Sequence, residues 1–305
     1  MRQGLPYLPK RPDLKQLQAA GQYHRHGDGS RFSSEHPVVH VLLGQPQALQ
    51  VHERHDDGLS LIDGQPTLLY KGEAVTPVEL FPASDFFKQK TSSGMPFMGN
   101  AVLQGCDWVA FQCLWPCDYA CAGKPCQFCF SGGQFDALAK RHKPMPFIPS
   151  PRDVSEVVLY AVEHDGVNSM QLTGGSTFKA ETEERYITAY MRDMLESGAR
   201  DALKGELLLY ITPPERHDVI DRYFDLGASR IACSLEVWDD RLGESITPGK
   251  RSFTTKELHL DALTYIADKY GPGKSFCNFI IGLEPFETLK ECSCTVRKQA
   301  TENKR

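Results

Sequence analysis

The sequence predicts an α/β fold in which a parallel sheet alternates with helices, preceded by a small β-rich N-terminal region. Two observations lead to this prediction. From Gly105 onward, short apolar runs alternate with longer stretches of helical spacing, and about five such βα units can be counted. The first hundred residues are instead rich in Pro, Gly, His and Asp, with strand-like runs between turn signals. With 305 residues and 41% hydrophobic content, the chain can bury a sizeable core.

Five apolar runs are expected to form the parallel strands, because strands that are buried on both faces are nearly continuous in apolar residues. Right-handed crossovers would bring them into one sheet, either open or curled into a barrel. The runs cover residues 108–114, 169–175, 206–212, 229–238 and 275–282.

Helix signals stand between these strands. Ser150 is expected to cap a helix that has Pro151 at its first position and Asp153 three residues after the cap. The next helix, over 181–198, carries an apolar stripe and stops at Gly198. The stripe consists of Ile187, Tyr190, Met191, Met194 and Leu195.

Two further helices follow from capping signals. Thr212, Pro213, Pro214 and Glu215 stand in capping-box order and predict a helix start. Another helix, at about 254–270, is expected to start from Thr254.

We divide the chain into an accessory β-rich region (1–104), a core (105–290) and a polar tail (291–305). The accessory region holds the runs "VVHVLL" and "PTLLY" and the turn signal "IDGQP". Its histidines at 24–26 and 52–55 have polar neighbours and no cysteine nearby, so we interpret them as solvated surface groups.

Charge and hydropathy argue against a nucleic-acid-binding protein and against a membrane protein. The formal net charge of −5 gives no electrostatic reason to bind nucleic acid. The N-terminus lacks the apolar core of a signal peptide, and no stretch reaches the roughly 18 apolar residues of a membrane span. We therefore expect a cytoplasmic protein with no membrane partner and no clear nucleic-acid partner.

Five of the ten cysteines lie within "CLWPCDYACAGKPCQFC", residues 113–129. In a reducing compartment, clustered cysteines are more often metal ligands or redox groups than disulfides. Cys126 and Cys129 form a C-x-x-C pair that can reach one metal or cluster, and a third ligand would come from Cys121 or Cys117. A closed zinc site usually needs a second distant pair, which is missing. The spacing fits an iron-sulfur cluster with one open iron better.

Other unusual residues follow the strands. Gly174 and Gly175 come after the second strand, Glu236 ends the fourth, and Gly282 and Glu284 end the fifth. The carboxyl ends of parallel strands share one edge of a sheet, where α/β proteins bind their ligands. These residues and the cysteine loop are therefore expected to meet.

The stretch Cys126-Gln127-Phe128-Cys129, with an aromatic residue before the last cysteine, resembles the radical S-adenosylmethionine (radical SAM) superfamily, whose usual motif is C-x-x-x-C-x-aromatic-C. "LTGGS" (172–176), "SLEVWD" (234–239) and "FIIGLEP" (279–285) are similar to three further motifs of that family. The resemblance covers about residues 105–285 and implies a partial (β/α) barrel of radical SAM type.

The resemblance also implies roles for site residues. The glycine-rich segment would contact the methionine amino group, the strand-four segment the ribose, and the strand-five segment the adenine. The implied cofactor-binding residues are Gly174, Gly175, Ser176, Ser234, Glu236, Ile280 and Gly282.

The cysteine spacing departs from the usual motif. It is C-x4-C-x2-C if Cys121 is the third ligand, and C-x8-C-x2-C if Cys117 is. We favour Cys121, because the intervening Gly-Lys-Pro loop resembles a lengthened form of the motif, and keep Cys117 as the alternative. Cys106, Cys113, Cys233 and Cys277 are interpreted as small apolar residues without a site role.

The activity that the resemblance implies is reductive cleavage of S-adenosylmethionine by a 4Fe-4S cluster. Cleavage gives a 5′-deoxyadenosyl radical that attacks an unknown small-molecule or peptide substrate, with electrons from an external donor of flavodoxin or ferredoxin type. Two alternatives stay open: a zinc-binding structural or interaction module, and an electron-transfer iron-sulfur protein without adenosylmethionine chemistry.

The C-terminal end leads to one more expectation. Cores of the family that this chain resembles typically have six βα units, whereas no apolar run after Gly282 can supply a sixth strand. We therefore expect a partial barrel with an exposed edge, as in a truncated and weakly active form of a longer enzyme.

Overall fold

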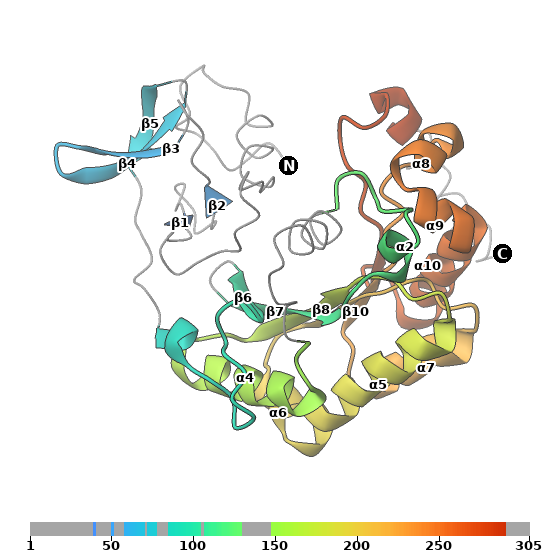
Figure 1. The fold of residues 1–305 in the computed structure, drawn as a ribbon, viewed down its shortest axis with the longest axis horizontal. Helices are drawn as coiled ribbons and strands as arrows, with labels where there is room; N and C mark the ends of the chain where they lie inside the picture. Colours follow the sequence, from blue (N-terminus) through green and yellow to red (C-terminus); the bar gives the residue numbers. More distant parts are fainter. Residues whose placement is uncertain are drawn as a thin grey trace.

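A six-stranded sheet organises the core of the protein in the computed structural model (Figure 1). The structure describes residues 39–40, 50–51, 58–70, 72–77, 85–104, 107–129 and 148–290. The sheet order is β11-β10-β9-β8-β7-β6, with β7 to β11 mutually parallel and β6 antiparallel to β7. The five predicted parallel strands are therefore confirmed. The strands are β6 (Ala101–Gln104), β7 (Trp108–Leu114), β8 (Ser169–Gly174), β9 (Leu207–Tyr210), β10 (Arg230–Ala232) and β11 (Ser275–Phe276).

Helices connect successive strands, and α4 to α7 line one face of the sheet (Figure 1). In the described part of the chain, β6 and β11 are the two edges of an open sheet, as expected for a partial barrel. The helices are η1 (Asp85–Lys88), α2 (Asp118–Cys121), α4 (Pro151–His164), α5 (Ala180–Glu196), α6 (Ala199–Ala202), α7 (His217–Asp225), α8 (Asp240–Ile246), α9 (Pro248–Phe253) and α10 (Lys256–Tyr270).

The cap of α4 forms as predicted. The Ser150 hydroxyl accepts from the Asp153 N–H, and the Asp153 carboxylate accepts from the Ser150 N–H, which makes a complete capping box. Such a cap contributes about 1 kcal/mol to helix stability. It fixes where the chain enters α4.

Two predicted helix starts are wrong. Helix α7 begins at His217 after Arg216, not at Thr212, because the Thr212 N–H is held by the Glu183 carboxylate and the Pro-Pro segment stays outside the helix. Helix α10 is capped by Thr255, whose hydroxyl accepts from the Leu258 N–H, and not by Thr254.

The core lies between the sheet and its helices. Residues 109, 111 and 113 of β7 and 170 and 172 of β8 belong to the buried apolar cluster, whereas the alternate residues face the other side. The predicted stripe of α5 is buried at Ile187, Tyr190, Met191 and Met194, and each such side chain stabilises the fold by about 1.5–3 kcal/mol. Leu195 departs from the prediction because 38% of it is exposed.

Residues 85–104 pack with the core. Phe86, Met95 and Phe97 are buried in the main apolar cluster, and β6 extends the sheet. Residues 85–104, which the division by sequence assigns to the accessory region, therefore contribute to the buried core.

The N-terminal region contains the expected short strands. Asp63 and Gly64, both with positive φ (53° and 78°), form the tight turn between β3 and β4 that "IDGQP" indicates. The histidines at 24–26 and 52–55 lie outside the described residues. The strands are β1 (Val39–His40), β2 (Gln50–Val51), β3 (Gly58–Ile62), β4 (Gln65–Tyr70) and β5 (Glu73–Pro77). None of the helices in the described ranges is both long and apolar enough to cross a membrane.

Candidate functional site

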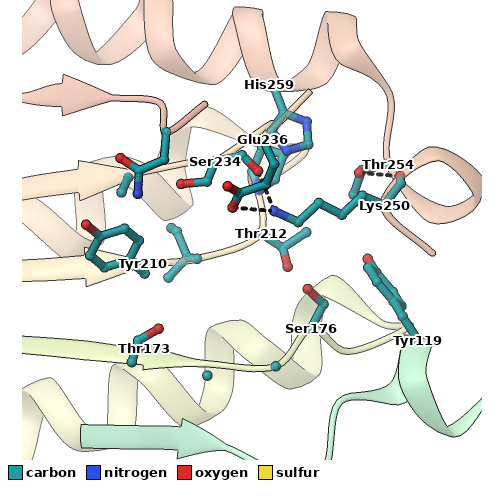
Figure 2. A pocket seen from close by; sticks show the side chains of 16 residues that line it. Tyr119, Thr173, Ser176, Tyr210, Thr212, Ser234, Glu236, Lys250, Thr254 and His259 are labelled. Atoms are coloured by element: carbon teal, nitrogen blue, oxygen red, sulfur yellow. Dashed lines mark hydrogen bonds and ion pairs between the residues drawn. The ribbon is translucent and has the colours of Figure 1, made fainter. Parts of the chain in front are cut away.

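A cavity of about 190 Å³ opens at the carboxyl ends of the parallel strands (Figure 2). It brings together five residues that the sequence singles out, namely Gly174, Gly175, Ser176, Ser234 and Glu236. They come from the ends of β8 and β10, which confirms that these two segments meet at one edge of the sheet.

Charge in this cavity is concentrated on one ion pair. The Lys250 ammonium, from α9, donates to the Ser234 carbonyl at 2.6 Å and to the Glu236 carboxylate at 3.2 Å. Both side chains are largely buried, so the pair is weakly screened by solvent. Although the Glu236 carboxylate is paired with Lys250, it still lines the cavity (Figure 2).

Glu236 adopts an unusual backbone conformation. Its φ of 71° lies in the left-handed region, which costs a residue other than glycine on the order of 1 kcal/mol or more. Its N–H donates to the Asn278 carbonyl and its carbonyl accepts from the Ile280 N–H, so the segment after β11 holds this conformation. The result is a carboxylate that points into the cavity.

The two glycines are required by packing. A Cβ on Gly174 would lie 2.6 Å from Leu114 Cβ, and one on Gly175 would lie 2.5 Å from Cys117 Cβ. Real Cβ atoms do not approach that closely. The glycines therefore let the cysteine loop lie directly on the end of β8.

Cys117 is the cysteine that touches the glycine-rich segment. Its Sγ accepts from the Ser176 N–H at 3.4 Å, and the neighbouring Asp118 N–H donates to the Ser176 carbonyl at 2.9 Å. Two predicted motifs are thereby joined at the cavity.

Cys126 is half-buried. Burial raises the pKa of its thiol to about 12; nearby Lys250 lowers that pKa, whereas Cys129, Glu236 and Cys117 raise it further. Cys121 is exposed, and burial, Asp118 and Cys117 raise the pKa of its thiol. Among the described residues, no three Cys, His, Asp or Glu side chains are arranged to share a single metal ion.

A hydroxyl in the cavity lacks a partner. Within the described ranges, Ser234 Oγ is buried and makes no hydrogen bond. Such a group usually marks a bound ligand or water. Together with a carboxylate, an ammonium and free thiols nearby, it fits a ligand that carries hydroxyl, amino and carboxylate groups.

The strand-five residues are placed differently. Ile280 and Gly282 follow β11 but do not line the cavity, although Ile280 bonds to Glu236. Glu284 is buried and accepts the N–H groups of Trp238 and Asp239, both at 2.8 Å. It joins the ends of β10 and β11.

Sequence reasoning missed several residues of the cavity. Lys250 comes from a six-residue helix that no periodic pattern marks. His259 is buried on α10, and this burial lowers the pKa of its imidazole to about 4, so it stays neutral at pH 7. Tyr210 lines the cavity as well. The other polar residues of the cavity that were missed are Tyr119, Thr173, Thr212, Thr254 and Asn278.

Comparison with known proteins identifies the family. The family model "Radical SAM superfamily" matches residues 117–292, more than half of the chain. Bacteriochlorophyllide c C-7(1)-hydroxylase from Chlorobaculum limnaeum is 25% identical over 264 residues, which cover 82% of this chain and 65% of the relative. The chain thus spans less than two thirds of that relative's length. Members of this superfamily are enzymes that bind a 4Fe-4S cluster and S-adenosylmethionine, so the match favours an iron-sulfur site over a zinc module or a plain electron carrier. The chain belongs to the radical SAM superfamily.

Proposed function

We propose that this chain cleaves S-adenosylmethionine at the described cavity and uses the product to activate a C–H bond of its substrate. The observation that carries the proposal is the contact between Cys117 Sγ and the Ser176 N–H, because it joins the cysteine loop to the cavity that contains Glu236 and Lys250. A cluster on this loop would lie beside a ligand in the cavity.

The cluster ligands that we propose are Cys117, Cys126 and Cys129, in place of the set with Cys121. Cys117 Sγ accepts from the Ser176 N–H beside the cavity, and Lys250 and Glu236, which line the cavity, both influence the pKa of the half-buried Cys126 thiol. Cys121 is exposed at the end of α2. Thiolates are soft ligands that suit iron and sulfide.

Adenosylmethionine would be held by groups of opposite charge. Lys250 is the proposed partner of the methionine carboxylate, because an ammonium on a largely buried stem favours an anion. Glu236 and Ser234 would accept and donate hydrogen bonds at the ribose hydroxyls. The glycine-rich segment, residues 174–176, would offer backbone carbonyls to the amino group.

With the cluster reduced, the two cofactors supply one-electron cleavage of the sulfonium carbon–sulfur bond. The chain's own contribution is positioning and the exclusion of water. Tyr119 and His259 both line the cavity and are themselves buried. His259 is neutral at pH 7, so it adds no charge beside Lys250.

The substrate is a separate question, because the motifs describe the shared cofactor. The name of the relative from Chlorobaculum limnaeum gives hydroxylation of a bacteriochlorophyllide. We propose tetrapyrroles as the first substrate class to test.

The deciding experiment is anaerobic reconstitution with iron and sulfide, followed by assay of methionine and 5′-deoxyadenosine with dithionite as reductant. We expect both products from the wild-type chain and neither from Cys126→Ala. Cys113→Ala is the matched control, since Cys113 is a buried thiol on β7 whose loss should leave iron content unchanged. Equal activity in both variants, or none in the wild type, would contradict the proposal.

A further inference from the structure

A second cavity, of about 90 Å³, adjoins the one described above. The two cavities share the lining residues Tyr119, Thr212, Pro213 and Thr254. The volume of the second cavity equals roughly that of three water molecules, so it suits a small group and not a macrocycle. A ligand bound there would lie beside the proposed adenosylmethionine site without occupying it.

Carboxylates outnumber cations in the lining of the second cavity. Arg216 is the one cationic side chain among the lining residues that the structure describes, and it is already paired with Glu184 at 3.5 Å and with Asp218 at 3.2 Å. Four glutamates line the cavity, and the three besides Glu184 make no ion pair with any described residue. The four are Glu181, Glu183, Glu184 and Glu215. The cavity therefore has an excess of negative charge.

Glu183 is the buried member of this set. It is 5% exposed and accepts the Thr212 N–H at 2.7 Å, but no described cation balances its charge. A buried carboxylate is costly unless a cation pairs with it. At the boundary of the two cavities, the Thr212 hydroxyl is also buried and makes no hydrogen bond within the described ranges. Both groups thus leave hydrogen-bonding capacity for a ligand.

Two aromatic rings supply an apolar wall to the same cavity. Phe178 and Phe253 are 50% and 43% exposed, and their ring centres lie 4.8 Å apart. The faces of such rings attract cations. The Lys124 ammonium lies 5.4 Å from the centre of the Phe253 ring but does not line the cavity, so Phe178 is the ring left for a ligand. Rings beside unpaired carboxylates favour a ligand with a positive charge and an apolar chain.

We propose that the second cavity binds an alkylammonium group, whose nitrogen pairs with the Glu183 carboxylate and whose carbon chain lies against Phe178 and Phe253. Glu181 and Glu215, both exposed, add to the negative potential that attracts such a cation. The group belongs either to a free amine or to the lysine side chain of a peptide. The inference goes beyond the proposed function, because it concerns a ligand other than adenosylmethionine.

The test is a calorimetric titration of the reconstituted full chain at pH 8, without reductant. The probes are n-butylammonium, its uncharged analogue n-butanol, and Nα-acetyl-lysinamide as the peptide source. The variants are Glu183→Gln, Phe178→Leu and Glu215→Gln, the last at an exposed side chain that packing does not need. The matched controls are Glu196→Gln, exposed at the end of α5, and Phe286→Leu, which removes a ring that is 62% exposed and lines neither cavity.

We expect butylammonium to bind at least about tenfold more tightly than butanol, and Glu183→Gln to raise its Kd about tenfold, as loss of a charge-assisted hydrogen bond does. Phe178→Leu should raise the Kd about threefold and Glu215→Gln about twofold. Both controls should bind as the wild type does, and the tighter of the two amines identifies the source of the group.

Four results would overturn the inference: equal binding of butanol, an unchanged Kd in all three cavity variants, no binding of either amine, or displacement of butylammonium by adenosylmethionine. The last result would show that the amine occupies the adenosylmethionine site. Because the titration needs no reductant, its outcome does not depend on whether the chain cleaves adenosylmethionine.

Discussion

Glu183 is a buried carboxyl group whose ionisation should make the free energy of unfolding depend on pH. It lies in the first turn of α5, is 5% exposed, and accepts the Thr212 N–H at 2.7 Å. Burial raises the pKa of this carboxyl from 4.5 to about 7, although hydrogen bonds from Thr212 and Thr177 lower it. The unfolded chain ionises it at the ordinary value.

The sign and size follow from this difference in pKa. Below pH 4.5 the carboxyl is protonated in both the folded and the unfolded state, so its burial does not lower the free energy of unfolding. As the pH rises through 7 the free energy of unfolding falls, because the carboxyl ionises more easily in the unfolded state. Each pKa unit corresponds to about 1.4 kcal/mol, so the loss is at most about 3 kcal/mol, and roughly 2 kcal/mol of it falls between pH 5 and pH 8.

The perturbation is Glu183→Gln, which keeps an acceptor for the Thr212 N–H and cannot ionise. Urea unfolding of variant and wild type at pH 5 and pH 8 should show similar stability at pH 5 and a more stable variant at pH 8. At each pH the free energy of unfolding of the wild type is subtracted from that of the variant, because His259 affects both proteins and acts in the opposite direction. The pKa of its imidazole is lowered to about 4, so its contribution to stability is lost as the pH falls from 6.5 through 4.

The control is Glu196→Gln, which removes an exposed carboxylate from the last position of the same helix, α5. It should change stability by the same small amount at both pH values. If the difference between Glu183→Gln and wild type is also independent of pH, the buried carboxyl does not have the raised pKa and the reasoning fails.

Three further predictions concern the site. Cys117→Ala should lose the visible absorption and iron of the reconstituted cluster, while Cys121→Ala should keep them; the opposite result would return the third ligand to Cys121. Lys250→Gln should weaken adenosylmethionine binding by about tenfold or more in an equilibrium titration, as loss of a charge-assisted hydrogen bond does. The control is Lys256→Gln, which removes a lysine paired with Asp240 and should bind adenosylmethionine as the wild type does. Gly175→Ala should lower the thermal midpoint, because the added Cβ meets Cys117 at 2.5 Å and overpacking costs about 1–3 kcal/mol; an unchanged midpoint would show that the loop can move aside.

Helix starts can be predicted from the sequence only where the capping contacts are local. The capping box at Ser150 is local, since every group it needs lies within four residues, and it was predicted correctly. The pattern at Thr212 looks equally good in sequence, but Glu183, 29 residues earlier in the chain, takes the Thr212 N–H. A tertiary contact therefore displaced a local one.

The candidate site divides in the same way. Gly174, Gly175 and Glu236 could be inferred from the sequence, because strand ends carry ligand contacts in parallel sheets. The family and the residues Ser176 and Ser234 were implied by the resemblance of the motifs. Lys250 and His259 could not be inferred, since they reach the cavity from helices whose orientation depends on packing across the whole chain.

The sequence by itself determined the alternation of strands and helices and the radical SAM motifs, because spacing and residue type along the chain are enough to specify them. Only the tertiary structure decided that the glycines make room for the cysteine loop and that Cys117, not Cys121, lies against Ser176. It also set Glu236 and Lys250 together in the cavity. The physical reason is that burial, close approach and charge pairing are properties of atoms brought together from distant segments, and spacing along the chain does not contain them.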